Sequence, residues 1–202
     1  MNPTRRQENI LRKQGYQKIA GVDEVGRGAW AGPLVAAAVI LPVEFKLIGL
    51  KDSKQLSPAL REQFFLKIIN NASAWAVGLV SEKTIDQHGL TYANLLAMEQ
   101  AINRLAIAPD YILLDAFNLK KITLPQKAII KGDQKIYCIA AASIVAKVFR
   151  DNLLKRFHRT FPQYNFARHK GYGTREHYEL ICQHGICELH RQSFRPFNSL
   201  VE

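Results

Sequence analysis

The ten residues from Ile19 to Gly28 constrain the fold of this chain more than any other segment. They read as an apolar strand that ends in two adjacent carboxylates, Asp23 and Glu24, before a Gly26-Arg27-Gly28 turn. Carboxylates at the end of a buried strand are costly unless a positive group meets them. A divalent metal is the usual partner, because hard cations such as Mg²⁺ take oxygen ligands and keep positions open for phosphate. The segment therefore predicts a strand within a sheet, with a metal-dependent phosphodiester site at its end.

The hydrophobic pattern further along predicts three strands in succession and then helices that alternate with strands. Ser57 and Pro58 have the chemistry of a helix start, and Thr84 with Gln87 forms a capping box that begins another helical stretch. The expected strands cover about 18–25, 34–41, 74–82, 111–115 and 127–131. The expected helices are clearest over about 58–70, 92–105, 142–157 and 174–185. This order predicts one α/β domain with a mixed sheet and helices on its faces.

The net charge of the chain is +11, which is typical of a protein with a polyanionic partner or with a strongly solubilised surface. The distribution favours the polyanion, since residues 147–195 hold ten Lys or Arg against four Asp or Glu, interleaved with aromatic rings. Residues 1–15 are polar and basic, and predict a short helix with Ile10 and Leu11 inward or a loose tail. With no signal-peptide or membrane-span pattern and only three cysteines, we expect a cytoplasmic protein.

Several motifs, in order along the chain, resemble the signature of the bacterial type-2 ribonucleases H, the ribonuclease HII family. Besides the segment 19–28 they are Lys51–Leu56, Ile112–Ala116, Gly132–Asp133 with Ala140–Asp151, His169–Thr174 and His190–Pro196. The resemblance implies a ribonuclease-H-like α/β fold, a mixed five-stranded sheet flanked by helices, with a mostly helical C-terminal extension. We accordingly expect an N-terminal basic helix or tail (1–17), a catalytic core (18–160) and a C-terminal helical substrate-binding segment of the same domain (161–202).

Four carboxylates form the candidate metal site. Asp23 and Asp115 each end a predicted strand and Asp133 follows a third, so they converge at one edge of the sheet if these strands are neighbours. Glu24 is harder to place in this site, because successive residues of a strand face opposite ways. It can share a site with Asp23 only if the backbone leaves the regular strand at this point. Within the family pattern all four are metal ligands. From the residues alone, Asp115 is as well explained by a cap or turn, and Asp133 lies in a Gly-Asp turn dipeptide.

Choosing RNA over DNA requires contact with a 2′-hydroxyl, which the backbone of Gly26, Arg27 and Gly28 can approach closely. A plain tight turn is the alternative. The resemblance assigns this loop to the ribonucleotide and its flanking phosphate, and it assigns Tyr172 to stacking on the sugar at the RNA–DNA junction. We expect the glycines on either side of Tyr172 to leave its ring accessible, with a core tyrosine as the alternative. The candidates for phosphate contact are Lys51, Lys54, Lys147, Arg150, Lys170 and Arg191, of which Lys54 and Lys147 are preferred because each lies in a matched motif.

A group of soft ligands near the end of the chain suggests zinc at first sight. Cys182, His184, Cys187 and His190 fall within nine residues. Their spacing is not that of a standard zinc finger, and the first two lie at a predicted helix end. We therefore expect packing or surface roles for these side chains.

The sequence and the resemblance together predict a metal-dependent endoribonuclease. It would hydrolyse the RNA strand of RNA–DNA hybrids and cut 5′ of ribonucleotides embedded in duplex DNA, by two-metal-ion catalysis with Mn²⁺ or Mg²⁺, leaving 3′-hydroxyl and 5′-phosphate ends. We expect a monomer that binds RNA–DNA hybrid and ribonucleotide-containing duplex DNA, and no membrane. The alternatives are another metal-dependent nuclease of the ribonuclease-H-like superfamily, and a non-catalytic hybrid-binding protein.

Overall fold

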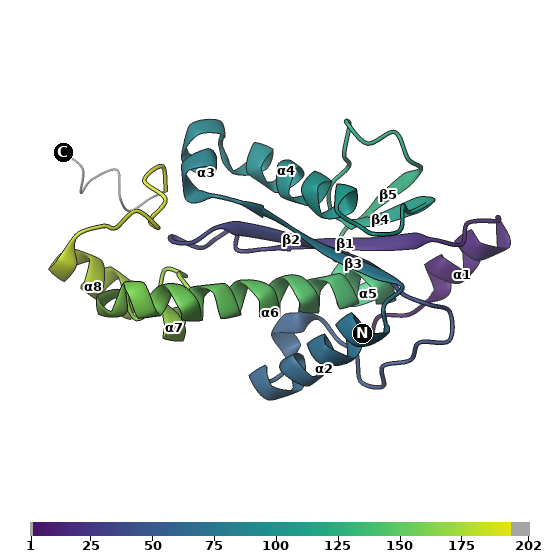
Figure 1. Cartoon of the computed structure of the whole chain (residues 1–202), viewed down its shortest axis with the longest axis horizontal. Coiled ribbons are helices and arrows are strands. Elements are labelled where there is room, and N and C mark those ends of the chain that lie inside the picture. Colours follow the sequence, from purple (N-terminus) through teal and green to yellow (C-terminus); the bar gives the residue numbers. More distant parts are fainter. Residues whose placement is uncertain (1, 195–202) are drawn as a thin grey trace.

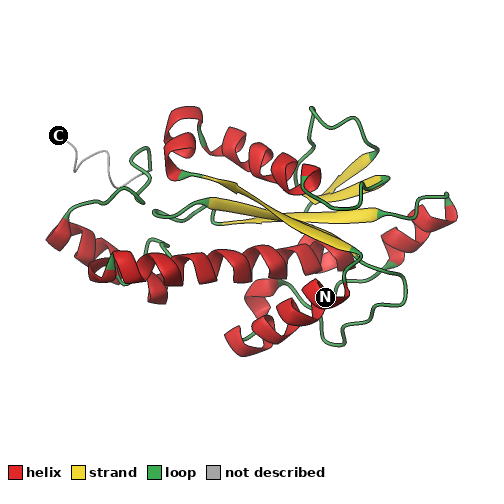
Figure 2. Ribbon diagram, viewed as in Figure 1, coloured by secondary structure: helices red, strands yellow, loops and turns green. Residues whose placement is uncertain are grey.

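The structure, a computed structural model, describes residues 2–194 and contains a five-stranded sheet with helices on both faces (Figures 1 and 2). The strands are β1 (Ile19–Val25), β2 (Leu34–Ile40), β3 (Ala74–Val80), β4 (Tyr111–Asp115) and β5 (Gln126–Ile129). The helices are α1 (Arg6–Lys13), α2 (Pro58–Asn71), α3 (Glu82–His88), α4 (Leu90–Asn103), α5 (Gly132–Lys135), α6 (Tyr137–Thr160), α7 (Phe166–His169) and α8 (Arg175–His184). Short 3₁₀ turns, η1 (Ser53–Gln55) and η2 (Pro162–Tyr164), precede α2 and α7.

The strand order is β3-β2-β1-β4-β5, which places β1 at the centre of the sheet. The strands β1, β2 and β3 pair antiparallel in sequence, whereas β1 pairs parallel with β4, and β4 parallel with β5. The predicted mixed sheet with five strands is confirmed. Because β1 and β4 are parallel neighbours, their carboxyl ends meet at the same edge, where open α/β sheets place ligands.

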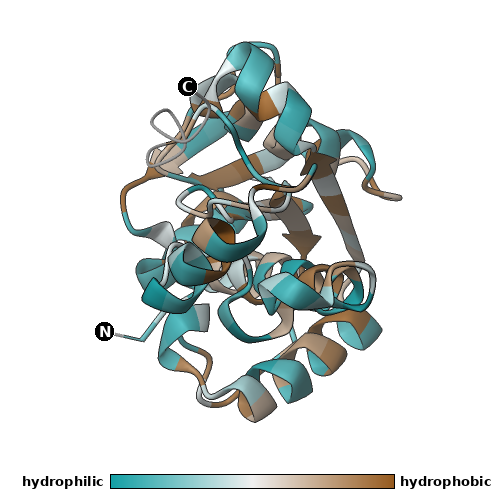
Figure 3. Ribbon diagram, turned by 90° about the vertical axis from the view of Figure 1, so that its left-hand side faces the viewer, coloured by the Kyte–Doolittle hydropathy of each residue, from teal (hydrophilic) through white to brown (hydrophobic). Residues whose placement is uncertain are grey.

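Strand β2 shows how the core is divided into two layers. Ala37 and Val39 pack on one face, in a buried cluster with α2 and α6, while Ala36 and Ala38 pack on the other, with α3 and α4. This alternation follows from the two-residue period of a strand, and its continuous apolar sequence reflects burial on both faces. Figure 1 shows α3 and α4 on one side of the sheet and α2 and α6 on the other. In Figure 3 the sheet is largely hydrophobic, while much of the outward surface of the helices is hydrophilic.

The long helix α6 lies against β1 at unusually close range. A Cβ atom added at Gly21 would lie 2.2 Å from the carbonyl carbon of Cys138, so only glycine permits this approach. Asp23 lies two residues further along β1 and therefore on the same face as Gly21. The close contact thus places Asp23 between the end of β1 and the first half of α6.

Several boundaries differ from the sequence predictions. The Ser57 cap is confirmed, since its hydroxyl accepts a hydrogen bond from the Leu60 N–H. The prediction of a capping box that begins at Thr84 is wrong. Ser81 is the N-cap of α3, and its side chain accepts a hydrogen bond from the N–H of Thr84, which already lies inside the helix. The predicted strand 74–82 consequently ends at Val80, because Ser81 starts the helix first. Helix α6 begins at Tyr137, five positions before the predicted start.

The N-terminal segment forms a helix, α1, rather than a loose tail. Leu11 is buried as predicted, but Ile10 is 42% exposed and the expectation that it points inward is wrong. Glu8 takes the inward position instead, because residues three apart share a helix face. No helix within residues 2–194 is long and apolar enough to cross a membrane. The part of the predicted C-terminal segment from 195 to 202 lies outside the described residues.

Candidate active site

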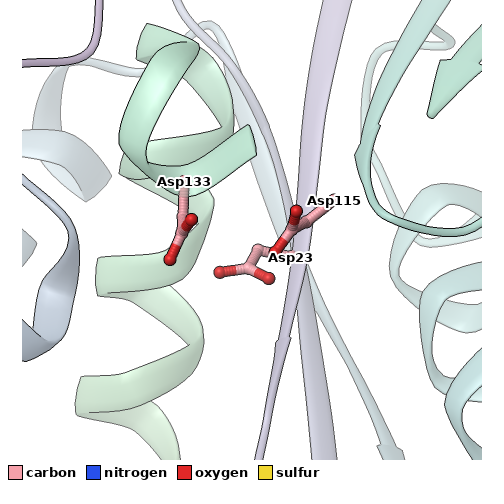
Figure 4. Close-up of side chains that lie close together, drawn as sticks. All are labelled: Asp23, Asp115 and Asp133. Atoms are coloured by element: carbon pink, nitrogen blue, oxygen red, sulfur yellow. The ribbon is translucent and has the colours of Figure 1, made fainter. Parts of the chain in front are cut away.

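Three of the predicted metal ligands meet at the edge of the sheet. Asp23, Asp115 and Asp133 each offer a carboxylate oxygen, and these oxygens lie within 4.8 Å of one another. Figure 4 shows the three side chains gathered together, Asp23 and Asp115 from neighbouring strands and Asp133 from the helical turn beside them. The convergence expected from the strand ends is thus present in the structure.

The backbone around each aspartate explains this convergence. Asp115 is the last residue of β4, and its Oδ1 accepts a hydrogen bond from the Gly132 N–H at 2.8 Å. Lys131 adopts the left-handed conformation and turns the chain from β5 into α5, so that Asp133 occupies the first turn of this helix. The two interpretations of Asp133, as part of a turn and as a metal ligand, are therefore compatible, because the turn places its carboxylate beside Asp23 and Asp115.

Glu24 lies beside this group but not within it. Strand β1 keeps its regular pairing through Glu24 to Val25, and the chain leaves the strand only at Gly26, where φ is +92°. Glu24 lines the same cleft, with its Oε1 3.4 Å from Arg27 Nη1. Its Oε2 atom is buried and has no hydrogen-bond partner within the described chain. An orphaned buried carboxylate oxygen fits a nearby cation, and the ligand role of Glu24 stays a prediction.

The electrostatics of the acids also fit a metal. Burial raises the pKa of Asp23 well above its usual range, and the carboxylates of Glu24 and Asp115 raise it further. Burial raises the pKa of Glu24 to about 7, against the opposing effect of Arg27, and it also raises the pKa of Asp133. Acids this crowded are mutually repulsive unless a cation joins them. The donors are all oxygens, which suits Mg²⁺ or Mn²⁺ rather than a soft metal.

A cleft of about 350 Å³ joins the acids to polar and basic side chains. Lys54 and Lys147 line it, as does the half-buried Tyr172. Burial by itself would lower the pKa of Lys54, but nearby carboxylates, including Asp133 and Asp23, raise it. Lys147 Nζ forms an ion pair with Asp151 at 2.8 Å, outside the group of aspartates. Both preferred lysines therefore lie where a phosphate beside the acids would pass, and their contact with phosphate remains a prediction.

The hydroxyls of Ser53 and Ser143 also line the cleft. They are buried and lie 2.8 Å apart, so one donates to the other. Their pairing joins η1 to α6 across 90 residues, a tertiary contact for which neither local sequence carries a signal.

The loop after β1 and the loop around Tyr172 are joined to each other. The N–H groups of Trp30 and Ala31 both donate to the Gly171 carbonyl, at 2.8 and 3.1 Å. A Cβ at Gly171 would lie 2.3 Å from the Ala31 oxygen, and one at Gly173 would lie 2.2 Å from the Trp30 ring. These glycines therefore serve close packing between the two loops, which is a different reason from the ring accessibility inferred from sequence.

Two of the six phosphate-contact candidates are placed otherwise. Arg150 and Arg191 are fully buried, and their guanidinium groups donate to backbone carbonyls. Burial and the neighbouring Arg150 lower the pKa of Arg191 to about 9, so it stays charged at neutral pH. The prediction that these two arginines contact phosphate is wrong, because their charges face the protein interior.

The cysteine and histidine group forms no metal site. Cys182 and His184 are exposed, whereas Cys187 Sγ lies 3.2 Å from Nδ1 of the buried His190. Within residues 2–194 the aspartate cluster alone brings three such ligands together. His190 instead belongs to a packed row of imidazoles, with its Nε2 3.1 Å from Nε2 of His177.

The sequence model of the ribonuclease HII family matches residues 20–196 of this chain. The chain belongs to the ribonuclease HII family. It is 48% identical over 188 residues to the ribonuclease HII of Caldicellulosiruptor saccharolyticus, covering 93% of this chain and 91% of that relative. The predicted membership, drawn from motifs within the same span, is confirmed.

Solved structures of ribonuclease HII relatives share the fold. The ribonuclease H2 of Pyrococcus horikoshii OT3 matches with a TM-score of 0.77 and 29% identity, covering 91% of this chain and 96% of that one. The ribonuclease HII of Archaeoglobus fulgidus, solved in complex with PCNA, matches with a TM-score of 0.70 and 27% identity, over 88% and 95% of the two chains. As a member of this family the protein is a metal-dependent endonuclease, and the aspartate cluster is typical of a site for Mn²⁺ or Mg²⁺.

Proposed function

We propose that this protein hydrolyses the RNA strand of RNA–DNA hybrids and incises duplex DNA on the 5′ side of an embedded ribonucleotide, leaving 3′-hydroxyl and 5′-phosphate ends. The observation that carries the proposal is one cleft containing the three clustered aspartates, two lysines and Tyr172. The acids would hold metal, the lysines would face phosphate, and the tyrosine ring would lie against a sugar.

The role proposed for each residue follows from the chemistry of its side chain. Asp23, Asp115 and Asp133 would hold the metal, with Glu24 as a further ligand. When bound, Mn²⁺ or Mg²⁺ ions supply polarisation of the attacking water and stabilisation of charge on the leaving oxygen. Lys54 and Lys147 would orient the phosphates on either side of the reacting bond. The net charge of +11 would draw the nucleic acid to this surface and make its affinity dependent on salt.

The activity is tested with duplex DNA that carries one ribonucleotide, beside a long RNA–DNA hybrid, in Mn²⁺, Mg²⁺ or chelator. We expect metal-dependent incision immediately 5′ of the ribonucleotide. Asp115→Asn should lower the rate about a hundredfold or more, because it removes a charged ligand. The matched control is Asp110→Asn at the opposite end of β4, where the carboxylate accepts hydrogen bonds from the N–H groups of Gln17 and Lys18.

The other outcomes separate the alternatives. Cleavage of the hybrid without incision at the single ribonucleotide would contradict the junction part of the proposal. Cleavage of neither substrate, with tight binding that Asp115→Asn leaves unchanged or improves, would favour a hybrid-binding protein. Incision of all-DNA duplexes at the same rate would favour another nuclease of the ribonuclease-H-like superfamily.

A further inference from the structure

The loop that follows β1 is fastened from inside the protein by a buried arginine. Arg191 donates from Nε and Nη2 to the Gly32 carbonyl, at 3.0 and 2.7 Å, and from Nη1 to the Arg27 carbonyl at 3.1 Å. In the described part of the chain no carboxylate lies within 4.0 Å of its guanidinium. Glu82 and Asp86 lie near enough to favour its charge but form no ion pair with it, so the direct partners of this buried guanidinium are the two loop carbonyls.

The bond to Arg27 fixes the orientation of the next peptide group. In a trans peptide the C=O and the following N–H point in opposite directions. Since the Arg27 carbonyl points to the buried Arg191, the N–H of Gly28 points away from it, to the outside. Gly28 is exposed, and a Cβ atom added there would meet nothing within 4 Å. Among residues 2–194, no protein acceptor lies in hydrogen-bond range of the Gly28 N–H.

We propose that Arg191 is a positioning residue for substrate selection: it holds the Arg27–Gly28 peptide so that the Gly28 N–H is presented to the 2′-oxygen of the ribonucleotide. The inference rests on the proposed function. A free N–H can donate to a 2′-oxygen, which is present in RNA and absent from DNA. The absence of a side chain at Gly28 leaves room for the sugar to approach the backbone. Without the bond from Arg191, the same peptide can rotate and the donor is no longer preorganised.

The measurement is a ratio of two affinities. Duplexes that are identical except for one ribonucleotide are titrated with the enzyme, with Ca²⁺ in place of Mn²⁺ to suppress incision. Wild type should prefer the ribonucleotide duplex. Arg191→Gln should lower this preference about tenfold, the value of one lost hydrogen bond, while the affinity for the all-DNA duplex stays unchanged. Mn²⁺ binding by the aspartates, followed by calorimetry, should also stay unchanged.

The matched control is Arg150→Gln. Arg150 is equally buried and also donates to three carbonyls, those of Ala31, Pro33 and Lys170, but to none in the Arg27–Gly28 turn. Arg150 also lies against Tyr172, with its guanidinium carbon 5.3 Å from the ring centroid, so this variant measures the loosening of the neighbouring loops and of Tyr172 together. It should leave the preference ratio much closer to the wild-type value than Arg191→Gln does. Arg191→Lys is the second variant, for the case that Arg191→Gln does not fold. Its single ammonium keeps the charge but lacks the fork that spans two carbonyls, so it should also lose preference.

The possible results distinguish a failure of the inference about Arg191 from a failure of the proposed function. A folded Arg191→Gln or Arg191→Lys enzyme with the wild-type ratio would overturn the inference. So would an equal loss of preference in Arg150→Gln, because the effect would then be general loosening. If wild type itself neither prefers nor incises the ribonucleotide duplex, the proposed function fails rather than the role of Arg191.

Discussion

The glycines near the cleft have different tasks, which their surroundings reveal. Gly26 has a φ of +92°, and a Cβ there would lie 2.3 Å from Arg150 Nε. Gly28, two positions later, has open space around it and no positive φ. The first glycine is therefore required by the protein's own packing. Nothing within the described chain requires the second, which leaves the approach of a ligand as its physical reason.

This difference gives a paired prediction. Gly28→Ala should leave the free energy of unfolding within about 0.5 kcal/mol of wild type, yet lower kcat/KM on the single-ribonucleotide duplex about tenfold or more. Gly26→Ala should destabilise the fold by about 1–3 kcal/mol, because of backbone strain and the contact with Arg150. Urea denaturation and incision kinetics on both variants check this. Unimpaired incision by Gly28→Ala would contradict a close approach of substrate at this position.

At the level of single residues, the roles of the acidic side chains were predicted better from the sequence than those of the basic side chains. Asp23 and Asp115 were found because their chemistry falls at strand ends, a position readable from local hydrophobicity. Arg150 and Arg191 were misassigned to phosphate, because a charge at the surface and a charge donating to buried carbonyls look the same in a sequence. Only the tertiary contacts distinguish them.

Among the elements, the packing of α6 against β1 determines the geometry of the site. Strand β1 carries Asp23, and α6 carries Ser143 and Lys147 into the same cleft. Their separation is set at Gly21, where the α6 backbone comes within contact distance of the strand. Any side chain at this position would push the helix away from the strand and widen the site.

We therefore predict that Gly21→Ala is harmful to both stability and metal binding. The added methyl group would overlap the Cys138 backbone, which cannot move as a flexible side chain can. The expected cost is about 1–3 kcal/mol or more, with a weaker affinity for Mn²⁺. Thermal unfolding and calorimetric titration measure the two effects, with Gly28→Ala as a control that adds the same methyl group in open space. Unchanged metal affinity would show that the site tolerates movement of α6.

The elements themselves were largely predictable, but their ends were not. Strands β1 and β2 have continuous apolar sequences that indicate burial on both faces, and the structure confirms both strands. The start of α3 was misjudged because Ser81 and Thr84 are both plausible N-caps, and only the backbone geometry selects Ser81. The early start of α6 at Tyr137 depends on its packing against β1, which local propensity does not register.

Across the whole molecule, buried histidines tie the C-terminal segment to the site. His190 Nδ1 accepts from the Cys187 N–H at 2.9 Å, so the proton of this ring is on Nε2, which donates to His177 Nε2 at 3.1 Å. His177 therefore accepts at Nε2 and donates from Nδ1 to the Tyr172 carbonyl at 3.0 Å. Both rings are therefore neutral. Burial and the nearby His169 lower the pKa of His177 to about 3, and burial lowers that of His190 to about 4.

These lowered pKa values predict loss of stability in acid. Below pH 6.5 the unfolded chain binds protons at both histidines, whereas the folded chain does not until about pH 4 and pH 3. Over this range each histidine lowers the free energy of unfolding by as much as about 1.4 kcal/mol per pH unit as pH falls. His177→Gln should flatten the pH dependence by one histidine's share, as measured by urea denaturation from pH 7.5 to pH 4.5. The exposed His184→Gln is the control, and an unchanged slope in His177→Gln would contradict the prediction.

The fastening of the β1 loop by Arg191 also bears on the order of events during folding. Arg191 bonds to residues that precede it by 164 and 159 positions, a separation that spans nearly the whole chain. Contacts so distant in sequence are slow to form, because a long loop must close first. Asp23, Asp115 and Asp133 need only β1, β4 and α5 to associate, whereas the Arg191 bonds also need the chain that follows, α6 to α8, to be in place. We therefore expect the metal-binding acids to come together during folding before Arg191 fixes the loop that follows β1. Selectivity for the substrate would then be the last property of the site to form.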